Sequence, residues 1–130
     1  MAIIPDTKDW TWVTERPCPE CGFDPAGVTP DRIGPELLAT VPRWQAALAE
    51  PGAHVRPDDS TWSVLEYAAH VRDVCRVFDA RLQLMLGQDN PEFADWDQNA
   101  AAVEGRYAGQ DPRAVAEELA AAAAEAAAGL

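Results

Sequence analysis

The sequence predicts an all-α protein that forms a helical bundle in one domain. The segment from residue 60 to residue 86 repeats apolar residues at three- and four-residue steps, and the segment after residue 111 is rich in alanine, a strong helix former. No segment of useful length alternates polar and apolar residues as a strand does. With 130 residues, of which 48% are hydrophobic, the chain is long enough to bury one core without disulfides.

Residues 1–30 are expected to form an irregular N-terminal arm, and residues 31–130 the bundle domain. Five prolines and two glycines interrupt the arm and prevent a helix there. Trp10 and Trp12 alternate with polar residues, which predicts a short extended stretch laid over the domain.

A first helix is predicted to begin near Asp31, a good N-terminal cap, and to end near Glu50, before a Pro-Gly pair. Its apolar positions fall on one stripe: Ile33, Leu37, Val41, Trp44 and Leu48. Pro35 lies in the first turn, where its missing N–H is harmless. Pro42 lies deeper and predicts a kink or an earlier end of the helix.

A second helix is predicted from a cap at Ser60 or Thr61 to Leu86, with Gly87 ending it. Its apolar residues form the narrow seam of a bundle helix: Val64, Ala68, Val71, Cys75, Phe78, Leu82 and Met85. We expect the middle of this seam to be buried, at Val71, Cys75, Phe78 and Leu82. The charged residues Arg72, Arg76, Asp79 and Arg81 are expected on the solvated outer face.

The rest of the chain predicts one short helix and one long one. Residues 88–98 are expected to be a loop anchored by Phe93 and Trp96, and a short helix to follow at residues 97–107. Asp111 and Pro112 are typical of a helix start and open the alanine-rich segment. An up-and-down bundle needs four helices, so its last helix is expected to be lacking or truncated. The seam left uncovered predicts a homodimer.

The charge of the chain excludes several kinds of partner. A net charge of −12 at pH 7 disfavours nucleic acid, because binding to phosphates requires clustered Lys and Arg. It also disfavours anionic membrane surfaces. The first 20 residues lack the apolar core of a secretory signal, and the three cysteines do not suggest a disulfide framework, so we expect a cytoplasmic protein.

His70 is the residue that the sequence most favours as a metal ligand. It lies at the edge of the second-helix seam, with Glu66 one turn before it and Asp73 nearly one turn after. The alternative is a boundary histidine beside carboxylates, which is common in helical proteins. One histidine cannot form a catalytic zinc or nickel site alone, because such sites need about three protein ligands.

The arm carries a second candidate site, the segment Pro17–Phe23, which contains a C-x-x-C motif followed by glycine. Cys18 and Cys21 resemble half of a zinc knuckle, but a second pair of ligands is absent from the sequence. Three interpretations stay open: a structural turn with free thiols, metal ligation, and a redox pair or disulfide. Cys75, on the second-helix seam, is expected to be a small core residue.

The segment Trp62–His70 resembles the second-helix signature of the DinB superfamily of four-helix bundles, which includes thiol S-transferases and mycothiol-dependent maleylpyruvate isomerases. In that pattern a Trp-Ser pair opens the helix, and a histidine eight residues after the tryptophan is the first metal ligand. The segment VTERPCPECG, Trp96-Asp97-Gln98 and Arg106-Tyr107 are similar to an actinobacterial branch of the superfamily.

This resemblance implies a divalent metal in the bundle core, Zn²⁺ first and Ni²⁺ or Mn²⁺ as alternatives. The metal would activate a low-molecular-weight thiol such as mycothiol toward an electrophilic substrate. His70 would be a ligand, oriented by Glu66 or Asp73, and Trp62 would serve packing.

Family members with a metal site take two further ligands from an H-x-x-x-H on the last helix. This chain has none, and its other histidine, His54, lies in a loop. We therefore expect the chain as given to be inactive as a thiol S-transferase or isomerase. The alternative is a non-catalytic binding or interaction domain, in which Cys18 and Cys21 bind a structural metal, joined by His70 if the arm folds back over the second helix.

Overall fold

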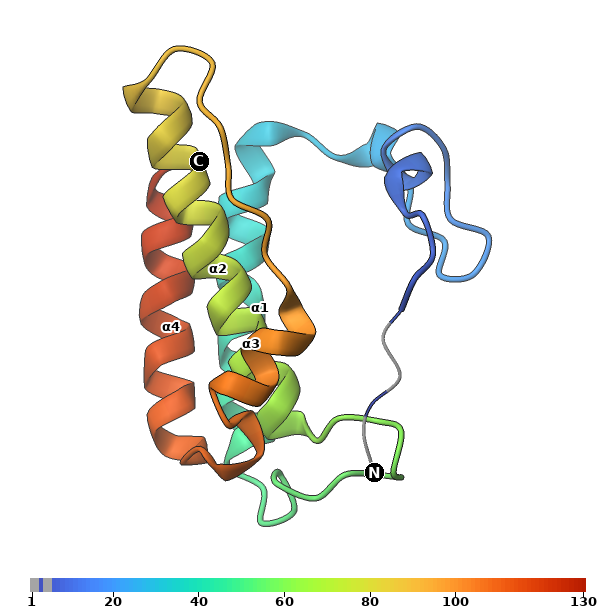
Figure 1. Ribbon diagram of the computed structural model, residues 1–130, viewed down its shortest axis with the longest axis vertical. Coiled ribbons are helices and arrows are strands. Elements are labelled where there is room, and N and C mark those ends of the chain that lie inside the picture. Colours follow the sequence, from blue (N-terminus) through green and yellow to red (C-terminus); the bar gives the residue numbers. More distant parts are fainter. Residues whose placement is uncertain (1–2, 4–5) are drawn as a thin grey trace.

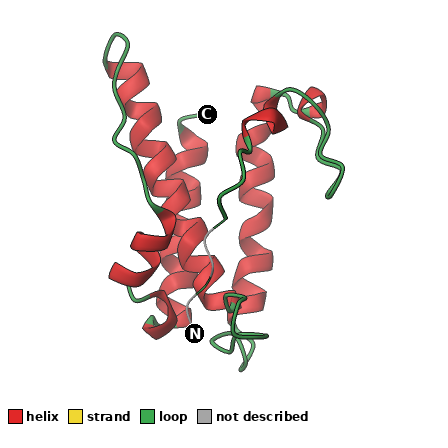
Figure 2. Ribbon diagram, turned by 45° about the vertical axis from the view of Figure 1, so that its right-hand side comes forward, coloured by secondary structure: helices red, strands yellow, loops and turns green. Residues whose placement is uncertain are grey.

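The computed structural model describes residue 3 and residues 6–130, and in this part of the chain it contains helices and no strand (Figure 2). The α-helices are α1 (Pro30–Leu48), α2 (Val64–Gly87), α3 (Gln98–Glu104) and α4 (Pro112–Ala128). Short 3₁₀ turns lie at Thr11–Thr14, Pro25–Gly27 and Tyr107–Gly109. The all-α prediction is therefore confirmed for the described residues.

Helix α4 packs against both α1 and α2, whereas α1 and α2 have much less contact with each other. Helices α2 and α4 run in the same direction, and α1 runs against them (Figure 1). These directions agree with the expected up-and-down order, in which the second and fourth helices run the same way and the first runs against them. Residues 88–97 return along α2 to the end of the bundle where α4 begins (Figure 1).

Helices α2, α3 and α4 begin at polar side chains that accept hydrogen bonds from otherwise unpaired backbone N–H groups. Helix α2 starts with a capping box, in which the Ser63 hydroxyl accepts from the Glu66 N–H at 3.2 Å and the Glu66 carboxylate accepts from the Ser63 N–H at 3.1 Å. The predicted cap at Ser60 or Thr61 is therefore wrong by two or three residues. Asp111 caps α4 as predicted, accepting from the Arg113 N–H at 3.2 Å.

The core joins α1, α2 and α4 through small and branched side chains. Its main cluster contains Leu48, Leu65, Ala68, Ala69, Tyr107, Val115 and Leu119, and a second cluster contains Cys75, Ala122, Ala123 and Ala126. Gly34 is buried, and a Cβ placed on it would lie 3.3 Å from the carbonyl oxygen of Ala127. Small residues on both helices thus let α1 and α4 approach closely.

The burial of the α2 seam differs from the prediction. Cys75 is buried as expected, but Phe78 is 57% exposed, and Val71 and Leu82 are only half-buried. Helix α4 covers the face of α2 that carries Leu65, Ala69 and Arg72. Each of these residues follows a seam residue by one position, and successive helical residues are about 100° apart, so this face lies to one side of the seam.

The uncovered side of the seam faces a largely apolar groove. The groove has a volume of about 260 Å³ and its lining comes from α1, α2 and the C-terminal end of the chain: Ile33, Leu37, Val74, Cys75, Phe78, Asp79, Leu82, Ala126 and Leu130.

Two other expectations about helix ends are corrected. Helix α1 does not end at Pro42 but continues through it. Because proline has no N–H, the carbonyl of Leu38 lacks its helical hydrogen bond. Both residues are exposed, so water can take the place of the missing donor. The short helix expected over residues 97–107 ends at Glu104, because Arg106 adopts a left-handed conformation with φ +49° and a 3₁₀ turn follows. None of the helices in the described part of the chain has the length and apolar character needed to cross a lipid bilayer.

Residues 8–30 of the N-terminal arm lie beside the start of α1 and away from α2 (Figure 1), whereas Ile3 and Asp6 line pockets beside the first turn of α2. The 3₁₀ turn at Thr11–Thr14 replaces the extended stretch expected around the tryptophans, and the rings of Trp10 and Trp12 pack on each other with centroids 5.9 Å apart. Lys8 forms an ion pair with Glu20 at 3.3 Å, which ties the two halves of the arm together.

Candidate functional site

His70 projects from α2 into a group of aromatic rings. Its imidazole stacks on the Trp96 ring with centroids 5.8 Å apart and an angle of 10°, and the Trp62 ring lies 5.5 Å away. Trp96 belongs to the segment that returns along α2, so the expected anchoring of this loop is confirmed at Trp96, whereas Phe93, the other expected anchor, is 42% exposed. The Nδ1 atom of His70 is buried and has no hydrogen-bond partner. Burial lowers the pKa of His70, and the charge of Asp73 opposes this only in part, so the ring is neutral at pH 7.

Glu66 was a candidate to orient His70, but its carboxylate bonds to other groups. Its side chain is 4% exposed and receives two hydrogen bonds from Arg56, at 2.8 and 2.6 Å, besides the amide of Ser63. The hydrogen bonds from Arg56 keep the pKa of Glu66 below its usual value despite burial. This carboxylate therefore serves the ion pair and the helix cap.

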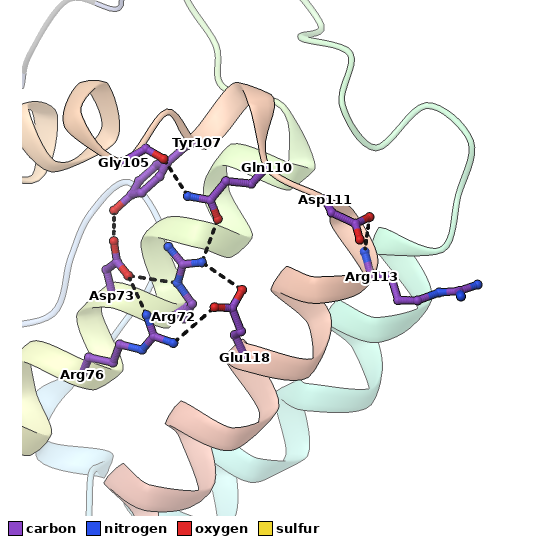
Figure 3. Close-up of polar contacts among 9 residues, drawn as sticks. All are labelled: Arg72, Asp73, Arg76, Gly105, Tyr107, Gln110, Asp111, Arg113 and Glu118. Carbon is purple, nitrogen blue, oxygen red and sulfur yellow. Dashed lines mark hydrogen bonds and ion pairs between the residues drawn. The ribbon is translucent and has the colours of Figure 1, made fainter.

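Asp73 likewise bonds elsewhere, because its oxygens are taken by Tyr107, Arg72 and, in an ion pair at 3.8 Å, Arg76 (Figure 3). The Tyr107 hydroxyl donates to one carboxylate oxygen, and Arg72 Nε donates to the other at 2.9 Å. Burial, reinforced by the hydrogen bond to Asp73, raises the pKa of Tyr107 well above its usual value. Neither predicted carboxylate bonds the His70 Nδ1 atom.

Arg72 is buried, which corrects its expected position on the solvated face. Its guanidinium donates to the Gln110 side chain at 2.7 Å and forms an ion pair with Glu118 of α4 at 3.4 Å. Arg76, on the same face, pairs with Glu118 at 3.6 Å (Figure 3). This polar network links α2, the turn after α3, and α4. Apart from the alternating charges of α2, no pattern in the sequence predicts this network.

A cavity of about 320 Å³ lies beside the aromatic group, at the end of the molecule where α2 begins. Two rings, two guanidinium groups and one carboxylate line it, from Trp62, Tyr107, Arg56, Arg106 and Glu66. His70 is not part of this lining. Trp62 lies against both His70 and Tyr107, with ring centroids 5.5 and 6.3 Å away, and it also lines the cavity.

The C-x-x-C motif forms a tight turn. The Cys18 N–H donates to the Phe23 carbonyl and the Gly22 N–H donates to the Cys18 carbonyl, both at 2.8 Å. Gly22 adopts φ +79°, a conformation that glycine accepts without strain. Hydrogen bonds from the backbone N–H groups of Cys21 and Glu20 lower the pKa of the Cys18 thiol. Cys75 lies apart from this turn in the helical core, as predicted, and burial raises the pKa of its thiol.

The predicted ligands do not assemble into one metal site. Over residue 3 and residues 6–130, no group of three or more His, Cys, Asp or Glu side chains is placed to hold a metal ion. Cys18, Cys21 and His70, which the alternative joins around one ion, are therefore not brought together in this structure, because residues 8–30 of the arm lie away from α2 (Figure 1). His54 is exposed in its loop, as expected, and contributes nothing to the site.

No family model matches the chain, and no curated protein or solved structure shows significant similarity to it.

Proposed function

We propose that this chain is a DinB-like helical scaffold for divalent-metal-dependent thiol chemistry, in which His70 is the ligand contributed by α2. The observation that carries the proposal is the state of His70, a neutral imidazole that stacks on one indole ring and contacts another, with a buried nitrogen that makes no hydrogen bond in the described part of the chain. Buried polar atoms are nearly always paired, so an unpaired ring nitrogen calls for a partner.

The described residues do not fit a complete metal centre. His70 offers one nitrogen, while Glu66 and Asp73 are committed to Arg56, Arg72 and Tyr107. A catalytic zinc site needs about three protein ligands and one open position. The proposed scaffold therefore requires ligands from a further element, and the chain as given has no thiol S-transferase or isomerase activity.

The test has two parts, of which the first asks whether metal reaches His70. Ni²⁺ or Mn²⁺ added to the isotope-labelled chain is expected to broaden the imidazole NMR signals of His70 more than those of His54, because the His70 ring is held in place by packing and its Nδ1 atom makes no hydrogen bond to the described residues. The broadening should disappear in His70→Ala and persist in His54→Ala. Broadening confined to His54 would overturn the assignment of the ligand.

The second part is an assay with mycothiol and an electrophilic substrate, with Zn²⁺, Ni²⁺ or Mn²⁺ added. We expect no metal-dependent turnover by the 130-residue chain. Turnover that is lost in His70→Ala would contradict the incomplete site, because it would require ligands that the described residues do not present.

A further inference from the structure

The turn at Cys18 already has the geometry of a metal-binding knuckle. Its two backbone hydrogen bonds of 2.8 Å close the loop around the motif, and Gly22 supplies the left-handed residue that reverses the chain. The backbone N–H groups of Glu20 and Cys21 donate to the Cys18 sulfur, and the Cys21 thiol also bonds to it. The two sulfurs are thus adjacent, and backbone dipoles already favour negative charge on one of them.

Proline makes this turn rigid before any ion binds. Pro17 and Pro19 flank Cys18, and each fixes its own φ. A site that is ordered in advance loses little conformational entropy on binding, so its affinity for an ion is higher. Paired thiolates select soft ions of tetrahedral preference, and Zn²⁺ is the common one.

One chain supplies only half of such a site. A structural zinc ion takes four ligands, and no third His, Cys, Asp or Glu is placed with Cys18 and Cys21 among the residues that the structure describes. Glu20, which lies between the cysteines in sequence, is paired with Lys8. A second molecule that presents the same pair of cysteines can supply the remaining two ligands.

We propose that the Cys18–Cys21 turn is a zinc half-site that the same turn of a second copy of this chain completes. Two copies related by a two-fold axis would present four cysteine sulfurs to one Zn²⁺, each thiol releasing its proton as the Zn–S bond forms, with no change of oxidation state.

The surroundings of the turn suit this partner. The turn lies on the arm, at the side of the molecule away from α2 and α4 (Figure 1). Cys21 is exposed there, and Cys18, the sulfur of which bonds to the Cys21 thiol, is buried. Trp10 is 37% exposed and Phe23 is 48% exposed, and these rings would lose contact with water between two copies. A zinc ion with four thiolates carries excess negative charge, and Lys8 places a cation beside the turn at Glu20.

The experiment follows zinc content and mass together. The full chain, reduced and stripped of metal, is titrated with Zn²⁺ under a non-thiol reductant while light scattering reports its mass. We expect one ion per two chains at the endpoint and a doubling of mass at the same point. Co²⁺ in place of Zn²⁺ should give the thiolate-to-metal charge-transfer band and the visible bands of tetrahedral four-sulfur coordination.

Cys18→Ser and Cys21→Ser should each lose the zinc-dependent dimer, with unchanged far-ultraviolet circular dichroism because the turn lies outside the helices. Cys75→Ala is the matched control for thiol removal, and His70→Ala separates this site from the proposed function; both should still dimerise with zinc. One ion bound per monomer, zinc-dependent dimerisation that survives in Cys18→Ser, or no zinc uptake by the reduced chain would each overturn the proposal.

Discussion

At the scale of single residues, the charged side chains of α2 act through partners that lie far away in the sequence. Asp73 bonds Tyr107, and Arg72 bonds Gln110 and Glu118, so groups that look like a solvated helix face are part of the interior. His70 could be singled out from the sequence because its spacing from Trp62 is local. Its stacking on Trp96 could not, because that contact depends on the path of residues 88–97.

The ion pair between Glu66 and Arg56 should make stability depend on pH. Since the pKa of Glu66 in the folded protein lies below the ordinary value of 4.5, its contribution is fully present above that value and is lost as the pH falls through the folded-state pKa. Glu66→Gln should therefore lower the free energy of unfolding at pH 7 by about 1–3 kcal/mol. The difference from the wild type should shrink in acid, as measured by urea denaturation at several pH values.

Glu36→Gln is the matched control, because Glu36 pairs with Arg32 on the surface, where both side chains are about two-thirds exposed. Exposed pairs of this kind contribute little, so its unfolding curve should follow that of the wild type. If Glu66→Gln were also neutral at pH 7, the buried pair would not be a stabilising contact.

At the scale of elements, the sequence located the helices well and their contacts poorly. Pro112 and Gly87 mark helix ends through their backbone chemistry alone. The predicted start of α4 is therefore the observed one, and the predicted end of α2 is within one residue of the observed end. The face of α2 that becomes buried was misjudged at Phe78. Helix α4 is mostly alanine and has little polar contrast, so its sequence does not indicate where it will pack.

The start of α2 gives a prediction about capping. Ser63→Ala removes the hydroxyl that accepts from the Glu66 N–H, and should lower the free energy of unfolding by about 1 kcal/mol in chemical denaturation. Thr29→Ala tests the same change at α1, where the Thr29 side chain makes no capping hydrogen bond. We expect a much smaller effect there, and equal losses in both variants would argue against the capping box.

At the scale of the whole molecule, α4 holds the bundle together. Helices α1 and α2 each pack against it and have little contact with each other. The groove between them leaves Phe78 and Leu82 partly uncovered, which agrees with the expectation that three substantial helices do not close this seam. That expectation needed only a count of helices. The parallel arrangement of α2 and α4 follows the up-and-down order, but it depends on residues 88–97, whose path no local pattern predicts.

The close approach of α1 to α4 can be tested at Gly34. Gly34→Leu would force side-chain atoms against the backbone of Ala127, and overpacking of this kind costs about 1–3 kcal/mol. Gly52→Leu is the control, since a Cβ at Gly52 meets nothing within 4 Å. Thermal unfolding should show a lower midpoint for the first variant only, and equal midpoints would mean that the two helices are less tightly packed than described.

The central position of α4 also bears on the order of folding during synthesis. Helices α1 and α2 leave the ribosome first, but each packs mainly against α4, which is made after both of them. A nascent chain that ends before residue 112 would therefore hold two amphipathic helices without a shared core. Cooperative folding should begin only after α4 has emerged, so these apolar faces depend on chaperones or on rapid translation until then.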